Sequence, residues 1–262
     1  MPKIEKNKKS SAYKVEKVFF NPRFLFFYFH MSWKNRIFAA VLKSEISYSK
    51  IYKANKIMEI SALQKERAAY QPKLPKALQG AVKIVEGAPT KSVDNQEEIK
   101  KLFPNTYGMP LIEFVPGEEN NTKRINIGVI LSGGQAPGGH NVISGLFDAV
   151  KKLNSENRLY GFLMGPGGLV DHKYIEITAD FIDQYRNTGG FDMIGSGRTK
   201  LEKEDQFEKG LEIIRKLDIS AIVIIGGDDS NTNACVLAEY YAAKKYGVQV
   251  IGCPKTIDGD LK

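Results

Sequence analysis

The sequence predicts an α/β fold of three layers, in which a parallel sheet has helices on both faces. Two observations indicate it. Continuous apolar runs rich in β-branched residues alternate with stretches of helical spacing, and several of the runs end in glycine-rich turns. The clearest run is ISAIVII at residues 219–225. Strands that are apolar on both faces and are separated by amphipathic helices are typical of parallel sheets.

The regular alternation begins at residue 125. Apolar, β-branched runs predict strands at residues 125–131, 161–164, 219–225 and 248–251. Helical spacing predicts helices at residues 141–153, 178–187, 204–217 and 232–246.

The segment before this alternation is predicted to be helical and then irregular. Residues 62–70 can form a short helix that Pro72 and Pro75 stop, and residues 75–86 have helical spacing with proline at the entry. Residues 89–117 are rich in Pro, Asn and Gly, and we expect them to wrap the surface.

Residues 1–57 differ in composition from the rest of the chain. They hold 13 Lys and Arg against 3 Asp and Glu, which leaves 25 against 27 in the remainder. The formal net charge of +8 therefore belongs to this segment, and the sequence does not support a basic nucleic-acid-binding face on the globular part.

Three interpretations of this first segment compete. Its aromatic run at residues 18–29 is broken by Asn21, Pro22 and Arg23 and is too short to span a membrane, which needs about 20 residues. A signal peptide would have the same break inside its apolar region, and no clear cleavage site follows. We expect instead that the segment lies outside the fold and that the working protein begins near Met58.

The predicted organisation has three parts. They are an extension at residues 1–57, a helical and surface-wrapping segment at 58–124, and an α/β domain at 125–262. Cys235 and Cys253 have neither metal-ligand spacing nor a disulfide framework, and their apolar neighbours predict two buried thiols in a reducing cytoplasm.

Glycines and cations mark the first two loops at the edge of the predicted sheet where ligands bind. Residues 131–140 (LSGGQAPGGH) include Gly133 and Gly134, which let the backbone approach an anion. A tight strand-to-helix turn also needs glycine, so both interpretations stay open. Residues 195–200 (GSGRTK) add Arg198 and Lys200, whose charges suit phosphate oxygens; the alternative is a solvated basic turn.

Carboxylates mark the other two loops. Residues 226–230 (GGDDS) place Asp228 and Asp229 directly after a buried strand, where they repel each other unless a cation or a donor lies between them. Mg²⁺ held through one carboxylate and substrate phosphates would remove that repulsion. The last loop, residues 254–260 (PKTIDGD), supplies a cation, a hydroxyl and two carboxylates: Lys255, Thr256, Asp258 and Asp260.

Together the four loops indicate Mg²⁺-assisted phosphoryl transfer to a hydroxyl. The glycine loops and basic residues would bind the phosphates, and a loop carboxylate would take the proton of the attacking alcohol. Composition alone does not name the substrate.

In order and spacing, these motifs resemble the phosphofructokinase family, and within it the long-form pyrophosphate-dependent 6-phosphofructokinases. The resemblance rests on residues 131–139 with their Gly-Gly-x-x-Pro-Gly core, and on residues 195–198, 226–230 and 254–260. It runs from about residue 61 to residue 262. It implies a phosphofructokinase-like, Rossmann-like fold.

The resemblance also implies which phosphoryl donor is used. ATP-using relatives usually have glycine at the positions of Asp229 and Lys255. Asp229 would place a carboxylate where the α-phosphate of a nucleotide must sit, and close like charges are unfavourable. Lys255 would offer its ammonium to pyrophosphate. The implied donor is therefore pyrophosphate.

The same resemblance assigns roles to the loop residues. Asp258 looks like the base for the 1-hydroxyl of fructose 6-phosphate, supported by Asp260 and Lys255, and Asp228 looks like the Mg²⁺ ligand. The implied contacts to phosphate or sugar are Gly133, Gly134, Arg198, Lys200, Asp229 and Thr256. A cytoplasmic glycolytic enzyme is implied, homo-oligomeric when complete, with pyrophosphate and fructose 6-phosphate as partners and neither nucleic acid nor membrane.

Family members carry the residues that grip the sugar and its 6-phosphate, including a Met-Gly-Arg motif, beyond the last residue of this sequence. We therefore expect a chain truncated before its second domain is complete, and inactive alone. One alternative is a non-catalytic phosphate-binding subunit that pairs with a complete chain, although intact Asp228, Lys255 and Asp258 argue against it. Another is a dinucleotide-binding domain, but this sequence lacks the glycine fingerprint that such a domain requires.

Overall fold

The computed structural model describes residues 61–118 and 123–257 of the chain. Residues from Ser61 onward form one compact unit. The predicted extension at residues 1–57 lies outside the described residues, as do Asp258 and Asp260.

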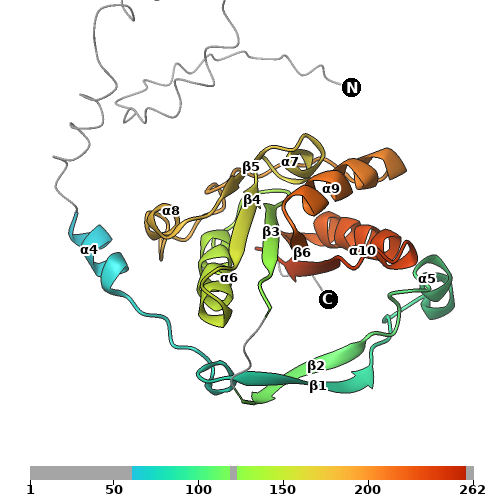
Figure 1. Ribbon diagram of the computed structural model, residues 1–262, viewed down its shortest axis with the longest axis horizontal. Helices are drawn as coiled ribbons and strands as arrows, with labels where there is room; N and C mark the ends of the chain where they lie inside the picture. Colours follow the sequence, from blue (N-terminus) through green and yellow to red (C-terminus); the bar gives the residue numbers. More distant parts are fainter. Residues whose placement is uncertain (1–60, 119–122, 258–262) are drawn as a thin grey trace, which may run out of the picture. The chain divides into compact units, whose positions relative to one another are not determined.

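A five-stranded sheet in the order β5-β4-β3-β6-β7 forms the centre of this unit (Figure 1). Its strands are β3 (Asn126–Leu131), β4 (Arg158–Phe162), β5 (Tyr174–Glu176), β6 (Ile219–Gly226) and β7 (Gln249–Pro254). The four neighbouring strands β4, β3, β6 and β7 are parallel, as predicted, and the short edge strand β5 pairs antiparallel to β4. An antiparallel edge strand on a parallel sheet is common in α/β proteins.

Helices cover both faces of the sheet, which confirms the predicted layering. The helices are α6 (Gly139–Leu153), α7 (Pro166–Val170), α8 (Ala179–Asp183), α9 (Glu204–Lys216) and α10 (Asp228–Ala243). Side chains of β6 alternate between two hydrophobic clusters: Ile222 and Ile224 pack with α7, α9 and α10, whereas Val223 and Ile225 pack with α6 and α8. Successive residues of a strand point to opposite faces of the sheet. The apolar residues of β6 therefore contribute to a buried cluster on each face.

The predicted helix at residues 75–86 is wrong. A short 3₁₀ turn, η3 (Lys76–Leu78), is followed by β1 (Val82–Pro89), which pairs antiparallel with β2 (Pro110–Pro116). The spacing of the apolar residues suited a helix, but pairing with a strand more than twenty residues later determines the conformation. The surface segment also contains an unpredicted helix, α5 (Gln96–Leu102), whereas the short helix predicted first is confirmed as α4 (Ala62–Ala69).

Smaller differences concern element boundaries and the cysteines. Helix α10 begins at Asp228, four residues before its predicted start. Neither α7 nor β5 was predicted. Cys235 is exposed and Cys253 is half-buried, so the prediction of two buried thiols is wrong. One helical residue turns the side chain by about 100°, so Cys235 points away from the sheet although its neighbour Ala234 is buried. None of the helices within residues 61–118 and 123–257 combines the length and the hydropathy of a transmembrane span.

Candidate functional site at the carboxyl edge of the sheet

The four predicted loops meet at one edge of the sheet. The Gly133 N–H donates to the Gly197 carbonyl at 2.9 Å, and Ser132 forms an isolated parallel bridge with Gly197. On the other side, the Lys255 N–H donates to the Gly226 carbonyl at 2.8 Å. Main-chain hydrogen bonds therefore join the loops after β3 and β7 to their neighbours.

Glycine is required in the first loop because of its backbone conformation. Gly133 has φ +84° and Gly138, which caps the N-terminus of α6, has φ +104°. L-residues with a side chain rarely adopt such angles. The Gly133 carbonyl also accepts a 2.5 Å hydrogen bond from the Ser196 hydroxyl, so the turn is bound to the second loop at both its N–H and its carbonyl.

Close backbone packing places the second loop beside the first. A Cβ at Gly197 would lie 2.1 Å from the Met164 carbonyl oxygen, so no larger residue fits there. The exposed guanidinium of Arg198 lies against the first loop: its Nη2 would be 3.4 Å from a Cβ at Gly134. The predicted cation and the predicted glycine are thus neighbours.

Asp228 and Asp229 form the first turn of α10 and not a free loop. Both carboxylates are exposed at the helix N-terminus, where the helix dipole favours negative charge. The Lys200 ammonium lies 3.6 Å from the Asp229 carboxylate, with exposures of 54% and 78% for the two side chains. A lysine therefore offsets part of the repulsion that the sequence predicted.

Lys255 is the best-fixed cation of the site. Its Nζ donates to the Gly134 carbonyl at 2.7 Å and lies 5.3 Å from the ring centroid of Phe191, and the side chain is half-buried. Thr256, next to it, is exposed. A single side chain from the loop after β7 therefore reaches across to the glycine loop after β3.

Sequence reasoning missed the polar side chains that hold these loops together. The Ser230 hydroxyl donates to the Ser132 hydroxyl at 2.8 Å, and both residues are buried. The Asn231 side-chain amide donates to the carbonyls of Gly226 and Gly227, each at 2.8 Å. The one available signal was their position inside the glycine and aspartate motifs, where small hydroxyl and amide side chains suit turns.

His140, at the start of α6, was also missed. Its ring is buried, and its Nε2 accepts hydrogen bonds from the N–H groups of Asp192 (3.1 Å) and Met193 (3.0 Å). Burial lowers the pKa of His140, and the Asp192 carboxylate opposes that shift without reversing it. The neutral imidazole therefore serves as an acceptor for the segment that leads into the second loop.

The donor set suits Mg²⁺ shared with a substrate better than a metal held by protein alone. Within residues 61–118 and 123–257, no group of three His, Cys, Asp or Glu side chains could hold a metal ion. Mg²⁺ is commonly bound through one or two carboxylates together with substrate phosphates and water. Asp228 is an exposed carboxylate in the first turn of α10 and fits that arrangement.

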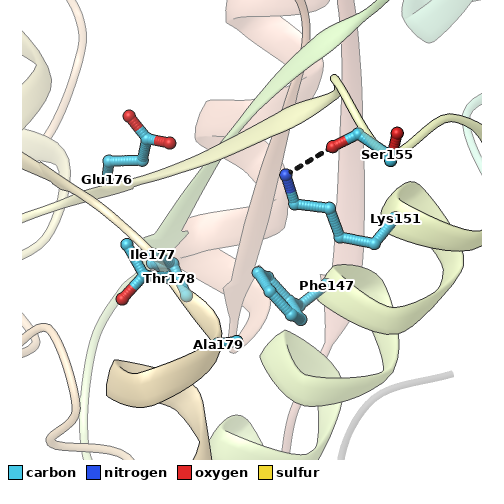
Figure 2. A pocket seen from close by; sticks show the side chains of 7 residues that line it. All are labelled: Phe147, Lys151, Ser155, Glu176, Ile177, Thr178 and Ala179. Atoms are coloured by element: carbon cyan, nitrogen blue, oxygen red, sulfur yellow. Dashed lines mark hydrogen bonds between the residues drawn. The ribbon is translucent and has the colours of Figure 1, made fainter.

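A separate cavity of about 460 Å³ lies between α6 and the segment that joins β5 to α8 (Figure 2). Phe147 and Ile177 contribute apolar surface, and the Lys151 ammonium is directed to the Ser155 carbonyl at 2.9 Å. None of the residues that line it belongs to the four loops. Ser155 precedes β4 and Glu176 pairs with Tyr160 of β4, so the cavity lies near the start of β4 and away from the loops at the carboxyl ends of the parallel strands.

The fold and the loops define an α/β protein that gathers glycine turns, cations and carboxylates at the carboxyl ends of parallel strands. A family model described as "Phosphofructokinase" matches residues 126–262. The chain belongs to the phosphofructokinase family.

Several relatives share one name. The chain is 69% identical over 206 residues to a pyrophosphate–fructose 6-phosphate 1-phosphotransferase of Porphyromonas gingivalis, a match that covers 78% of this chain and 38% of that protein. Over 208 residues it is 53% identical to a protein of that name from Entamoeba histolytica, with the same two shares. The matched part of the chain thus spans less than two fifths of the length of each of these two relatives.

A solved structure of a pyrophosphate-dependent phosphofructokinase from Nitrosospira multiformis is 26% identical in sequence to this chain, with a TM-score of 0.48. The match covers 52% of this chain and 35% of that chain.

Proposed function

We propose that the chain forms the pyrophosphate-binding part of a Mg²⁺-dependent phosphotransferase that phosphorylates the 1-hydroxyl of fructose 6-phosphate. The observation that carries the proposal is the hydrogen bond from Lys255 to the Gly134 carbonyl, because it supports a role for this lysine beside the glycine turn in selecting the phosphoryl donor. The names of the similar proteins support the choice of both substrates.

In this proposal, the phosphates bind among three cations and the glycine turns. Arg198 lies against Gly134, Lys200 lies beside Asp229, and Lys255 approaches from the opposite loop. Fixed positive charge and main-chain N–H groups stabilise phosphate oxygens and the charge that develops on them during transfer. Gly133 lets the backbone come close to the transferred phosphate.

Asp228 would hold the Mg²⁺, whose chemistry here is to neutralise charge on the phosphate oxygens. The proton of the attacking hydroxyl passes to Asp258 in this proposal, with Asp260 in support and Thr256 near the sugar. The positions of Asp258 and Asp260 lie outside the described residues, so the argument for them is the sequence motif. The complete enzyme is proposed to act in the cytoplasm, in glycolysis, as a homo-oligomer.

Asp229 and Lys255 would exclude ATP. A carboxylate about 4 Å from an α-phosphate is repelled by roughly 1–4 kcal/mol at effective dielectric constants between those of water and a protein surface. Because the Asp229 side chain is exposed to water, we expect a repulsion near the lower end of this range. Lys255 would contribute a charge-assisted hydrogen bond to pyrophosphate, worth about 1.5–3 kcal/mol.

Calorimetric titration of the purified chain with pyrophosphate or ATP, each with Mg²⁺, tests the proposal. Lys255→Ala should weaken pyrophosphate binding by about ten- to a hundredfold. Lys151→Ala, which removes a lysine at the remote cavity, serves as the matched control and should leave it unchanged. Asp229→Gly should narrow the preference for pyrophosphate over ATP. Equal affinity of the wild-type chain for both ligands would contradict the proposal.

A further inference from the structure

Lys255 makes two contacts that together set the direction of its ammonium. One is the hydrogen bond to the Gly134 carbonyl at 2.7 Å, and the other is the face of the Phe191 ring, whose centroid lies 5.3 Å from Nζ. Phe191 is 1% exposed, so the ring is a fixed part of the core. An ammonium over a buried aromatic face is attracted by the ring quadrupole.

The Phe191 ring is held by the start of α6. A Cβ at Gly139 would lie 2.3 Å from Cδ2 of the ring, so the absence of a side chain there lets the ring pack against the helix. The main chain on either side of Phe191 is bound to His140. The His140 N–H donates to the Gly190 carbonyl at 2.9 Å, and its Nε2 accepts from Asp192 and Met193.

The neighbours of His140 define its tautomer. Its Nδ1 lies 2.8 Å from the Thr188 hydroxyl oxygen, and that hydroxyl donates its own proton to the Tyr185 carbonyl at 2.7 Å. Thr188 must therefore accept, so Nδ1 carries the proton and Nε2 is free to accept the two N–H groups. The charged or titratable groups beside the ring are the Asp192 carboxylate, 3.0 Å from Nε2, and the phenol of Tyr185, whose ring centroid is 5.1 Å away.

We propose that Phe191 and His140 are positioning residues for Lys255: His140 fixes the segment at residues 190–193, and the Phe191 ring on that segment directs the ammonium toward the pyrophosphate site. The inference rests on the proposed function, because it assumes that Lys255 binds pyrophosphate. A proton on His140 Nε2 would oppose the two N–H donors and favour the Asp192 carboxylate instead. The support of Lys255 is therefore strongest when His140 is neutral.

A double-mutant cycle on pyrophosphate affinity tests the role of Phe191. Phe191→Leu should weaken binding by about tenfold in the wild-type chain and have almost no further effect in the Lys255→Ala chain. Phe162→Leu makes the same change at a fully buried phenylalanine of the other cluster and controls for general destabilisation. Equal losses in both backgrounds would overturn the inference. An unchanged affinity in Lys255→Ala alone would instead refute the proposed function.

The pH dependence of the same affinity tests the role of His140. Glutamine at this position keeps an oxygen acceptor but does not titrate, whereas alanine removes the acceptor. At pH 8, His140→Ala should therefore weaken binding more than His140→Gln does. As the pH falls from 8 to the point where the folded chain protonates His140, which lies below the ordinary histidine pKa of about 6.5, the affinity of wild type relative to His140→Gln should fall, and this ratio cancels the titration of pyrophosphate itself. A ratio that stays constant over this range would show that His140 does not position Lys255.

Discussion

Replacing Ser230 with alanine removes one member of a buried hydroxyl pair that joins α10 to the end of β3. The Ser230 and Ser132 oxygens lie 2.8 Å apart, with relative exposures of 6% and 5%. A buried polar group that loses its partner costs about 1–3 kcal/mol. Ser230→Ala should therefore lower the free energy of unfolding by about 2 kcal/mol, or Tm by about 4–8 °C for a unit of this size.

The double variant Ser132→Ala/Ser230→Ala separates a lost pair from lost packing. With both hydroxyls gone, no buried group is left unpaired, so the loss should be smaller than for either single variant. Urea unfolding followed by circular dichroism measures all four corners of the cycle. Ser144→Ala is the matched control, because that buried hydroxyl bonds a carbonyl within its own helix, and its loss should be close to neutral. Additive losses in the double variant would refute the reasoning.

Three further predictions concern the scaffold. The unfolding free energy should fall as the pH drops below about 6.5, the ordinary pKa of histidine, because burial lowers the pKa of His140 in the fold. His140→Gln should show a shallower fall in urea titrations at pH 8 and pH 5. Gly197→Ala should cost at least 1–3 kcal/mol, since its Cβ would lie 2.1 Å from the Met164 carbonyl; Gly145→Ala, at an exposed helical position with open space, should instead raise Tm. Glu239→Ala should speed proteolysis near residue 105, because the Glu239 carboxylate accepts hydrogen bonds from the Asn105 N–H and the Thr106 hydroxyl. An unchanged cleavage pattern would show that this contact does not hold the segment.

The four parallel strands of the central sheet were predictable because each contains a continuous apolar run that needs no partner to be recognised, whereas the short edge strand β5 has no such run. The strand β1 was not, because Val82, Ile84 and Val85 suit a helix as well as a strand until β2 pairs with them. The early start of α10 was hidden for a different reason. Its first turn is polar and lacks the apolar spacing on which helix prediction depends, so Asp228 and Asp229 read as a loop.

The cations of the site were predictable from residue type, but the contacts that orient them were not. Arg198, Lys200 and Lys255 are informative because charged residues beside glycines are typical of phosphate sites. The hydrogen bond between Ser132 and Ser230 joins positions 98 residues apart, so the sequence gives no indication that these two serines are partners. The acceptor role of His140 likewise depends on two main-chain N–H groups that only the folded chain brings to its ring.

A single residue, Gly227, separates the end of β6 from the first turn of α10. The junction therefore fixes the rotational phase of the helix relative to the sheet, with Asn231 bound to the carbonyls of Gly226 and Gly227. One inserted residue would turn the helix by about 100° and shift it by about 1.5 Å. Such a shift would carry Asp229 away from Lys200 while leaving every residue of the motif present. The geometry of the aspartate pair is thus a property of the length of the junction as much as of the aspartates themselves.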